Sequence, residues 1–388
     1  MRGSIIHITL LSLLVAMMVV MIIHPFLVKI ARHKHIVDNP NARKLNKEPV
    51  PILGGVGVVC GILFGMGVAG CCNLPQDMCA EIVVAMVLML YTGVGDDILD
   101  LSPRQKVALQ ILVLCMMIFS AEIYVDNLHG VWGIGYLPYP LSLCLTLLAG
   151  VGIINAINLI DGVDGLCALY VMMASLFFGL FLLYMGDVAY SVISFATLGA
   201  LLPFALHNMY GTKYKMFLGD GGSLVLGFIC ALLALRTIQL GREGMSLNVV
   251  AFAFATLSVP VCDTLRVMVV RILHRQSPFT PDKRHLHHMF IALGFSHRAT
   301  TFALSALGAT IVMLWLLCAM SGITADKQLL FILIVATSLV WGAYCVMSYV
   351  LNHNVAWTIS LRRMVRKYSL RQNEIIRRLE RVLDDKVR

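Results

Sequence analysis

Residues 5–30 read IIHITLLSLLVAMMVVMIIHPFLVKI, an apolar run that decides the fold class. A helix needs about 20 apolar residues to cross about 30 Å of hydrocarbon, and this run is long enough. It is too long for a secretory signal, and no small-residue cleavage site precedes the basic loop that follows. We therefore expect a retained membrane helix here.

The rest of the chain has the same character. Of its 388 residues, 59% are hydrophobic and 13% are charged, with a mean hydropathy of +0.85. A water-soluble core does not bury that much apolar surface, and open sheets in lipid leave backbone groups unpaired. We expect an all-α, polytopic membrane helix bundle of about eleven transmembrane helices. The predicted spans are 5–29, 52–72, 80–95, 106–121, 140–158, 166–185, 189–208, 221–239, 247–272, 299–320 and 328–349.

The basic residues predict the orientation of the bundle, because Lys and Arg of short loops stay in the cytoplasm. They gather in alternate loops, whereas the segment 122–138 has none. This pattern predicts an N-terminus outside and a C-terminus in the cytoplasm. Residues 1–350 form the predicted transmembrane domain, and residues 351–388 form a basic amphipathic helical tail, typical of an anionic lipid surface.

Four polar motifs fall on the predicted cytoplasmic side, which indicates a single site. They are Gly95-Asp96-Asp97, the stretch from Asn155 to Asp164, the stretch from Phe217 to Ser223, and His285-Leu-His287-His288. Carboxylates near hydrocarbon need a compensating cation. Mg²⁺ suits them, because it takes oxygen ligands and bridges to substrate phosphates. The glycines beside Asp96, Asp97 and Asp220 predict tight turns whose free backbone N–H groups approach a phosphate.

The spacing of Asn155, Asn158 and Asp161 predicts that they share one helix face, where amides ligate a metal or bond a nucleobase. The glycines that follow indicate that the helix unwinds there. The histidine loop also carries Lys283 and Arg284 and has no cysteine. This favours hydrogen bonds to a pyrophosphate over zinc binding. Two lysines suit a phosphate, although the charge rule for cytoplasmic loops explains them equally well: Lys44 and Lys106.

Together these motifs resemble those of the polyprenyl-phosphate N-acetylhexosamine-1-phosphate transferases, which start lipid-linked glycan synthesis. The resemblance runs from Arg43 to His288 and includes Pro-x-Pro-x-x-Gly-Gly, Gly-Asp-Asp, Asn-x-x-Asn-x-x-Asp-Gly-x-Asp-Gly and Phe-x-Gly-Asp-x-Gly-Ser. The His-Leu-His-His loop and the preceding Ser277-Pro-Phe are similar to the branch that uses undecaprenyl phosphate and UDP-N-acetylglucosamine. The phospho-N-acetylmuramoyl-pentapeptide branch typically has three consecutive histidines.

The resemblance also implies a role for each candidate residue. Asp220 would coordinate Mg²⁺ with Asn158 as second ligand, and Asp96 or Asp97 would activate the polyprenyl phosphate. Asp161 would serve either role and Asp164 would contact the uracil. The remaining residues implied to bind substrate are Lys44, Lys106, Asn155, His285, His287 and His288.

The implied reaction transfers an N-acetylhexosamine-1-phosphate, here GlcNAc-1-phosphate, from a UDP-sugar to undecaprenyl phosphate and releases UMP. The cofactor would be Mg²⁺, with Mn²⁺ as a substitute. We expect the chain to lie in the bilayer of the bacterial inner membrane, with its site facing the cytoplasm. A homodimer is expected as well, and no binding of nucleic acid. Direct displacement and a two-step route through an aspartyl phosphate stay open, as do the aminosugar and the pathway.

Two other functions are weighed against this one. An intramembrane prenyltransferase would use Asp96-Asp97-x-x-Asp100 and would require a second motif of this kind. This alternative also leaves the histidine loop unexplained. A transporter usually binds its substrate near the midplane, whereas these acids gather at one face. The charged pair inside the ninth span, Asp263 and Arg266, has either a structural role or a role in holding the substrate loop.

Overall fold

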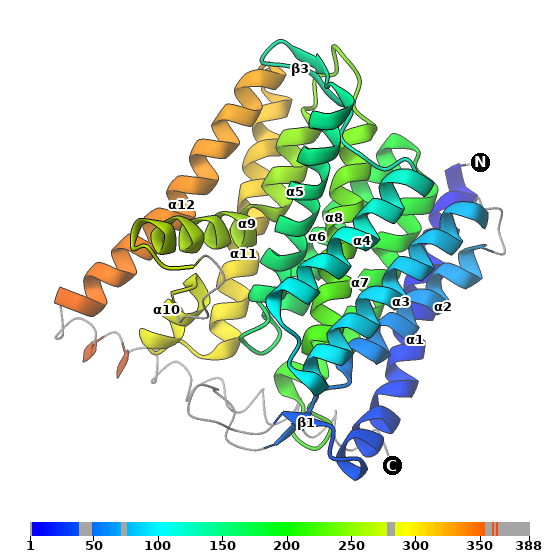
Figure 1. Ribbon diagram of the computed structural model, residues 1–388, viewed down its shortest axis with the longest axis vertical. Helices are drawn as coiled ribbons and strands as arrows, with labels where there is room; N and C mark the ends of the chain where they lie inside the picture. Colours follow the sequence, from blue (N-terminus) through cyan, green and yellow to red (C-terminus); the bar gives the residue numbers. More distant parts are fainter. Residues whose placement is uncertain are drawn as a thin grey trace.

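The computed structural model describes residues 2–38, 49–70, 76–277, 284–353, 359–360 and 362–363. Within these ranges the chain forms twelve helices and two short antiparallel hairpins (Figure 1). In order they are α1 (Arg2–His33), β1 (Val37–Asp38), β2 (Val50–Pro51), α2 (Gly54–Gly70), α3 (Gln76–Leu99), α4 (Pro103–Ser120), β3 (Asn127–Val131), β4 (Ile134–Tyr136), α5 (Tyr139–Leu159), α6 (Leu166–Met185), α7 (Val188–Tyr210), α8 (Gly219–Gln239), α9 (Val249–Leu273), α10 (Leu286–Ala292), α11 (His297–Met320) and α12 (Ala325–His353).

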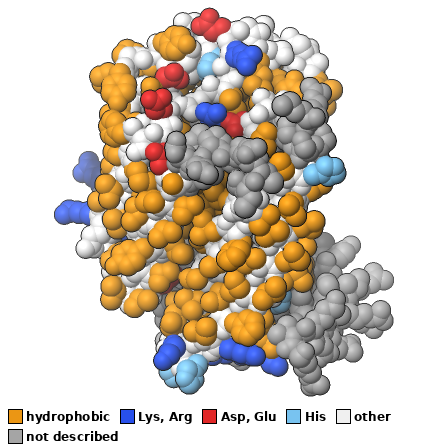
Figure 2. All heavy atoms as spheres, turned by 90° about the vertical axis from the view of Figure 1, so that its right-hand side faces the viewer, with side chains coloured by type: hydrophobic (Ala, Val, Ile, Leu, Met, Phe, Trp, Pro, Cys, Tyr) orange, Lys and Arg blue, Asp and Glu red, His pale blue; other side chains and the backbone are white. Residues whose placement is uncertain are grey.

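Each of the eleven predicted spans coincides with a helix. Among the described residues, ten helices are long and apolar enough to cross a membrane, and the eleventh span corresponds to the shorter α2. Hydrophobic side chains dominate the middle of the face in Figure 2, while Lys, Arg and His side chains occupy its lower edge. The chain is therefore a multi-pass membrane protein with the predicted all-α architecture.

Helix α8 lies at the centre of the bundle. Its residues from Gly221 to Leu235 are all buried, among α2, α3, α5, α6 and α9. Glycines let these helices approach. A Cβ on Gly55 of α2 would lie 2.2 Å from the backbone nitrogen of Gly222, and one on Gly93 of α3 would lie 2.3 Å from the Asp220 carbonyl oxygen. Several glycines of the motifs thus serve close helix packing.

The Gly95-Asp96-Asp97 motif is helical, which corrects the predicted turn. Helix α3 continues through these residues to Leu99, four residues beyond the predicted span. The chain turns only at Asp100, which has a positive φ of 50°. The backbone N–H of Asp100 still bonds the Asp96 carbonyl oxygen at 2.9 Å, so the helical hydrogen bonding extends past the motif.

The two hairpins mark opposite ends of the molecule (Figure 1). The segment before α8 bonds to the strand β2, because Phe217 N–H donates to the Pro51 carbonyl at 2.7 Å. The N-terminus of α8 therefore lies at the β1 end, as do the C-terminal ends of α3 and α5 that pack on it. All the motif residues on these helices meet at the β1 end.

Helix α9 contains Pro260, which cannot donate to the helical ladder and bends the helix. The part after Pro260 turns towards α12 (Figure 1). Trp341 of α12 donates its indole N–H to the Cys262 carbonyl at 3.1 Å. After the bend, Asp263 of α9 accepts from the Leu286 N–H at the start of α10, at 3.0 Å. The predicted basic tail, residues 351–388, lies almost wholly outside the described residues.

Candidate active site

Asp220, in the first turn of α8, joins three neighbouring elements. Its Oδ2 atom lies 3.1 Å from Lys106 Nζ of α4, and its Oδ1 accepts a hydrogen bond from Asn158 Nδ2 of α5 at 3.1 Å. Lys106 also forms an ion pair with Asp96 of α3. Four residues predicted for the site are thus brought together: Asp96, Lys106, Asn158 and Asp220.

Asp97 has a different partner from its neighbour Asp96. Its Oδ1 accepts from the backbone N–H of Asp220 at 3.0 Å, and its Oδ2 accepts from Gly221 N–H at 3.3 Å. The carboxylate therefore caps α8 and complements the positive end of the helix dipole. The expectation that these N–H groups are free for a phosphate is wrong, because Asp97 already occupies them.

Asp161 lies in the turn between α5 and α6, where the helix unwinds as predicted and Gly165 has a φ of +75°. Within the described ranges its side chain has no hydrogen bond or ion pair. Burial, followed by the charges of Asp220, Asp97 and Asp164, raises the pKa of Asp161 well above its ordinary value. Ionisation of Asp161 is therefore opposed by burial and by the neighbouring carboxylates, and a bound cation would favour it.

The oxygen atoms gathered here suit a hard divalent cation whose remaining coordination positions are filled by the substrate. No three His, Cys, Asp or Glu side chains of the described segments form a ready metal cluster. Mg²⁺ needs none, because it is usually held by one or two carboxylates, waters and phosphates. Asp220 and Asp161 offer carboxylate oxygens, and the Asn158 amide offers an oxygen when turned over. Lys106, a cation itself, already sits between two of the carboxylates.

Asp164 is held in an ion-paired cluster at the start of α6. Its Oδ2 lies 2.8 Å from Lys215 Nζ and 3.1 Å from His297 Nδ1, and its carbonyl accepts from Thr301 Oγ1 at 2.8 Å. Although burial raises the pKa of Asp164, the His297 hydrogen bond and the Lys215 charge outweigh burial and hold it below the ordinary value. The predicted contact with uracil stays a prediction, and Lys215 and His297 join the site as residues that the sequence did not single out.

The histidines lie at α10, beside the turn that carries Asp161. His287 is 2% exposed, and a Cβ on Gly162 would lie 2.8 Å from its Nε2. Its ring centroid is 4.2 Å from that of His288 and 5.8 Å from that of His285. Burial, then the neighbouring His288 and His285, lowers the pKa of His287 to about 3. His287 is therefore neutral near pH 7 and contributes hydrogen bonding instead of charge.

Asn155 lies one turn before Asn158 in α5, and it bonds to residues other than the acidic ones. Its Nδ2 donates to Gln110 Oε1 of α4 at 2.7 Å and to the Val151 carbonyl at 2.8 Å. Gln110 is fully buried. An amide in the middle of an apolar span was the available signal for this pair, because a polar group in hydrocarbon needs a partner.

The chain was compared with known proteins. The profile of glycosyl transferase family 4 matches residues 79–238. Undecaprenyl-phosphate alpha-N-acetylglucosaminyl 1-phosphate transferase of Escherichia coli (strain K12) is 30% identical over 288 residues, which cover 73% of this chain and 76% of the relative. The probable undecaprenyl-phosphate N-acetylglucosaminyl 1-phosphate transferase of Bacillus subtilis (strain 168) is 31% identical over 302 residues, 76% of this chain and 81% of the relative.

The chain belongs to glycosyl transferase family 4. The resemblance drawn from the motifs is thereby confirmed, and the names of the relatives favour the transferase over the prenyltransferase and the transporter. The matched segment contains both aspartates of α3, the turn with Asp161 and the first turn of α8. Lys44 lies outside the described residues, so its predicted contact with phosphate stays a prediction.

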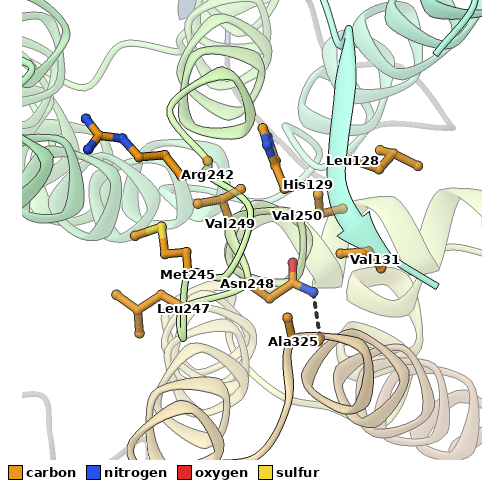
Figure 3. Close-up of a pocket in the computed structure, with 11 residues that line it drawn as sticks. Leu128, His129, Val131, Arg242, Met245, Leu247, Asn248, Val249, Val250 and Ala325 are labelled. Carbon is orange, nitrogen blue, oxygen red and sulfur yellow. Dashed lines mark hydrogen bonds between the residues drawn. The ribbon is translucent and has the colours of Figure 1, made fainter. Parts of the chain in front are cut away.

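A small pocket lies beside β3, at the end of the helix bundle opposite to the acidic residues (Figure 3). Asn248 donates to the Ala325 carbonyl at 2.6 Å, shown by the dashed line, and His129 Nε2 lies 2.7 Å from the Ile238 carbonyl oxygen. These two polar side chains of the pocket therefore bond to the protein itself. The acidic residues at the β1 end form the better candidate site.

Proposed function

We propose that the chain transfers N-acetylglucosamine-1-phosphate from UDP-N-acetylglucosamine to undecaprenyl phosphate and releases UMP. The names of the relatives supply both substrates. One observation carries the proposal. Asp220, at the N-terminus of the central helix, contacts Lys106 and Asn158 and lies near Asp96 and Asp161. Carboxylates and a lysine from four elements thus surround one place where two phosphate-bearing substrates would meet.

Asp220, Asp161 and Asn158 would hold a Mg²⁺ ion at this place. When bound, the ion would supply the positive charge that stabilises the charge developing on the departing UMP. Mn²⁺ would substitute, since it accepts the same oxygen ligands. The carboxylates that neighbour Asp161 support this assignment.

The reaction itself asks little covalent chemistry of the protein. An oxygen of the lipid phosphate attacks the β-phosphorus of the UDP-sugar, the bond from that phosphorus to the bridging oxygen breaks, and UMP leaves with the electron pair. The lipid phosphate has a second pKa of about 6 and is largely dianionic at neutral pH, so no base has to remove a proton. Lys106 then holds phosphate oxygens in line, and Asp96 sets the position of Lys106. We favour this direct displacement over an aspartyl-phosphate intermediate.

Asp97 acts on the site through the backbone of α8. By occupying the N–H groups of Asp220 and Gly221, it fixes the first turn of α8 and the direction of the Asp220 carboxylate. A fixed carboxylate loses less entropy when substrate and ion assemble on it. In this proposal Asp96 faces the substrates and Asp97 positions Asp220.

The β1 end would face the cytoplasm of a bacterial inner membrane. The helix ends and loops at this end carry most of the basic residues, for example Lys29 and Arg32 in the last turns of α1 and Lys34 just after it. Nucleotide sugars are cytoplasmic, so the donor would reach the acidic residues from this side.

The test offers purified protein undecaprenyl phosphate together with a panel of UDP-aminosugars and measures released UMP and the mass of the lipid product. We expect UMP release that depends on both substrates, and a lipid product heavier by GlcNAc-1-phosphate. Release of inorganic pyrophosphate from a prenyl diphosphate, or flux of solute across vesicles without UMP release, would contradict the proposal.

A further inference from the structure

A buried ion pair lies in the second half of α9, after Pro260. Asp263 and Arg266 are each 3% exposed, and Arg266 Nη2 lies 2.7 Å from Asp263 Oδ1. The same nitrogen donates to the Arg284 carbonyl at 2.6 Å, and the guanidinium carbon stands 3.6 Å from the centre of the Tyr344 ring of α12. A buried pair of this kind is costly to desolvate, so stability alone is a weak explanation for it.

Asp263 also holds the residues that lead into α10. His285 Nδ1 lies 3.0 Å from Asp263 Oδ2, and the Leu286 backbone N–H donates to both carboxylate oxygens, at 3.0 and 3.2 Å. Together with the bond from Arg266 to the Arg284 carbonyl, three consecutive residues are fixed to α9. The connection between α9 and α10 is therefore anchored where it reaches the histidines.

This arrangement determines which nitrogen of His285 carries a proton. A carboxylate only accepts, so Nδ1 must donate to Asp263 and Nε2 is the nitrogen left for another partner. His285 is 4% exposed, and its Nε2 is buried with no partner in the described part of the chain. A buried polar atom without a partner is costly, and such an atom indicates a ligand or water.

The same ring lies close to the candidate active site. It stacks on His287, with ring planes 10° apart, and His287 packs against Gly162, the residue after Asp161. His287 is neutral because burial and the neighbouring histidines lower its pKa to about 3. His285 has a carboxylate on its Nδ1, which leaves its buried Nε2 as the ring atom available to a ligand.

We propose that Asp263 and Arg266 are positioning residues for His285. They fix the ring so that its unpartnered Nε2 is the atom that meets the donor's diphosphate. Arg266 holds Asp263 in place and Tyr344 covers Arg266 from α12. This inference rests on the proposed transfer from UDP-N-acetylglucosamine.

A double-mutant cycle tests the inference with Asp263→Asn, His285→Gln and the double variant. Asparagine keeps the shape of Asp263 but lacks its charge and places an amide near Leu286 N–H. Because Asp263 acts through His285, we expect Asp263→Asn to lower kcat/KM for UDP-N-acetylglucosamine by about 10- to 100-fold, mainly by raising KM. In the His285→Gln background the same change should cost less than about twofold, because the ring it positions is gone.

If the fold-loss in kcat/KM of the double variant equals the product of the losses of the two single variants, the inference is overturned. A kcat/KM of Asp263→Asn within about twofold of wild type would also overturn it. If Asp263→Asn does not yield folded protein, Arg266→Lys replaces it in the same cycle. Lysine keeps the charge but does not reach both Asp263 and the Arg284 carbonyl, and the same non-additivity with His285→Gln is expected.

Asp187→Asn is the matched control. Asp187, which precedes α7, pairs at 2.6 Å with Arg236 in the last turn of α8. This pair therefore lies at the end of α8 opposite to Asp220, and it includes no histidine. Its kcat/KM should stay within about twofold of wild type, even where its melting temperature falls. A loss equal to that of Asp263→Asn would show general destabilisation and overturn the inference. If the wild type releases no UMP, the proposed function is wrong as well. If the wild type is active but the losses in kcat/KM of the two single variants simply multiply in the double variant, only this positioning role is wrong.

Discussion

At the scale of single residues, Asp96 and Asp97 show what a motif does not determine. They are adjacent and chemically identical, and the resemblance left open which of the two activates the lipid phosphate. In α3 they point in different directions, since consecutive helical residues are about 100° apart. Asp97 reaches the N–H groups of α8, whereas Asp96 reaches Lys106. Which carboxylate does which task depends on the helix that packs against each, and a motif does not contain that information.

The two aspartates should therefore respond differently to substitution. Asp97→Ala removes the cap of α8, and we expect a loss of about 1–2 kcal/mol of stability together with activity, because Asp220 loses its support. Asp96→Ala should lower activity while the melting temperature stays near that of wild type. Thermal melting in detergent and UMP release measure both effects. An Asp96→Ala protein less stable than Asp97→Ala would contradict these roles.

At the scale of elements, the sequence predicted the helices well and their packing poorly. Apolar length alone located all eleven spans, because lipid requires each span to satisfy its own backbone. It did not show that α8 is central, nor that Gly55 and Gly93 face it. Glycine serves turns and close packing alike, and only the neighbouring helix distinguishes the two uses.

Two glycines of α2 test the packing. Gly55→Ala would place a Cβ 2.2 Å from the Gly222 nitrogen, whereas nothing lies within 4 Å of a Cβ on Gly67. We expect Gly55→Ala to destabilise the protein by about 1–3 kcal/mol or more and to displace the Asp220 turn. Gly67→Ala should be neutral or slightly stabilising, because alanine favours a helix. Melting temperatures of both variants provide the comparison, and equal values would contradict the close approach of α2 and α8.

The packing of α10 should depend on pH through His287. Its pKa is about 3 in the folded protein against an ordinary value of 6.5, so below pH 6.5 the unfolded chain binds more protons. Stability should rise with pH up to about 6.5 and then level off, with at most about 2 kcal/mol lost between pH 7 and pH 5. Melting curves from pH 5 to 8 should show a smaller slope for His287→Gln. An unchanged slope would mean that His287 is solvated.

At the scale of the whole molecule, separate motifs converge at the β1 end, and this was predictable because hydropathy and charge together place each loop on one side. The sequence located Asp96, Asn158, Asp161 and Asp220 correctly as neighbours. It missed the supporting contacts of Gln110, Lys215 and His297, because these join elements far apart in the chain. The sequence left open whether Asp263 and Arg266 hold the loop after α9, and the structure shows the Asp263 carboxylate bonded to Leu286 N–H, 23 residues further along the chain.

We propose that Asp220 organises one divalent ion and two phosphate-bearing substrates at this end of the bundle. The most direct measurement is the initial rate of UMP release in vesicles containing undecaprenyl phosphate, with UDP-N-acetylglucosamine and titrated Mg²⁺, for wild type, Asp220→Asn and the control Asp187→Asn. We predict that the wild type and the control require Mg²⁺ and lose activity in excess chelator, while folded Asp220→Asn is slower by at least about 100-fold. A folded Asp220→Asn protein with near wild-type turnover, or a wild type indifferent to removal of the metal, would contradict the account.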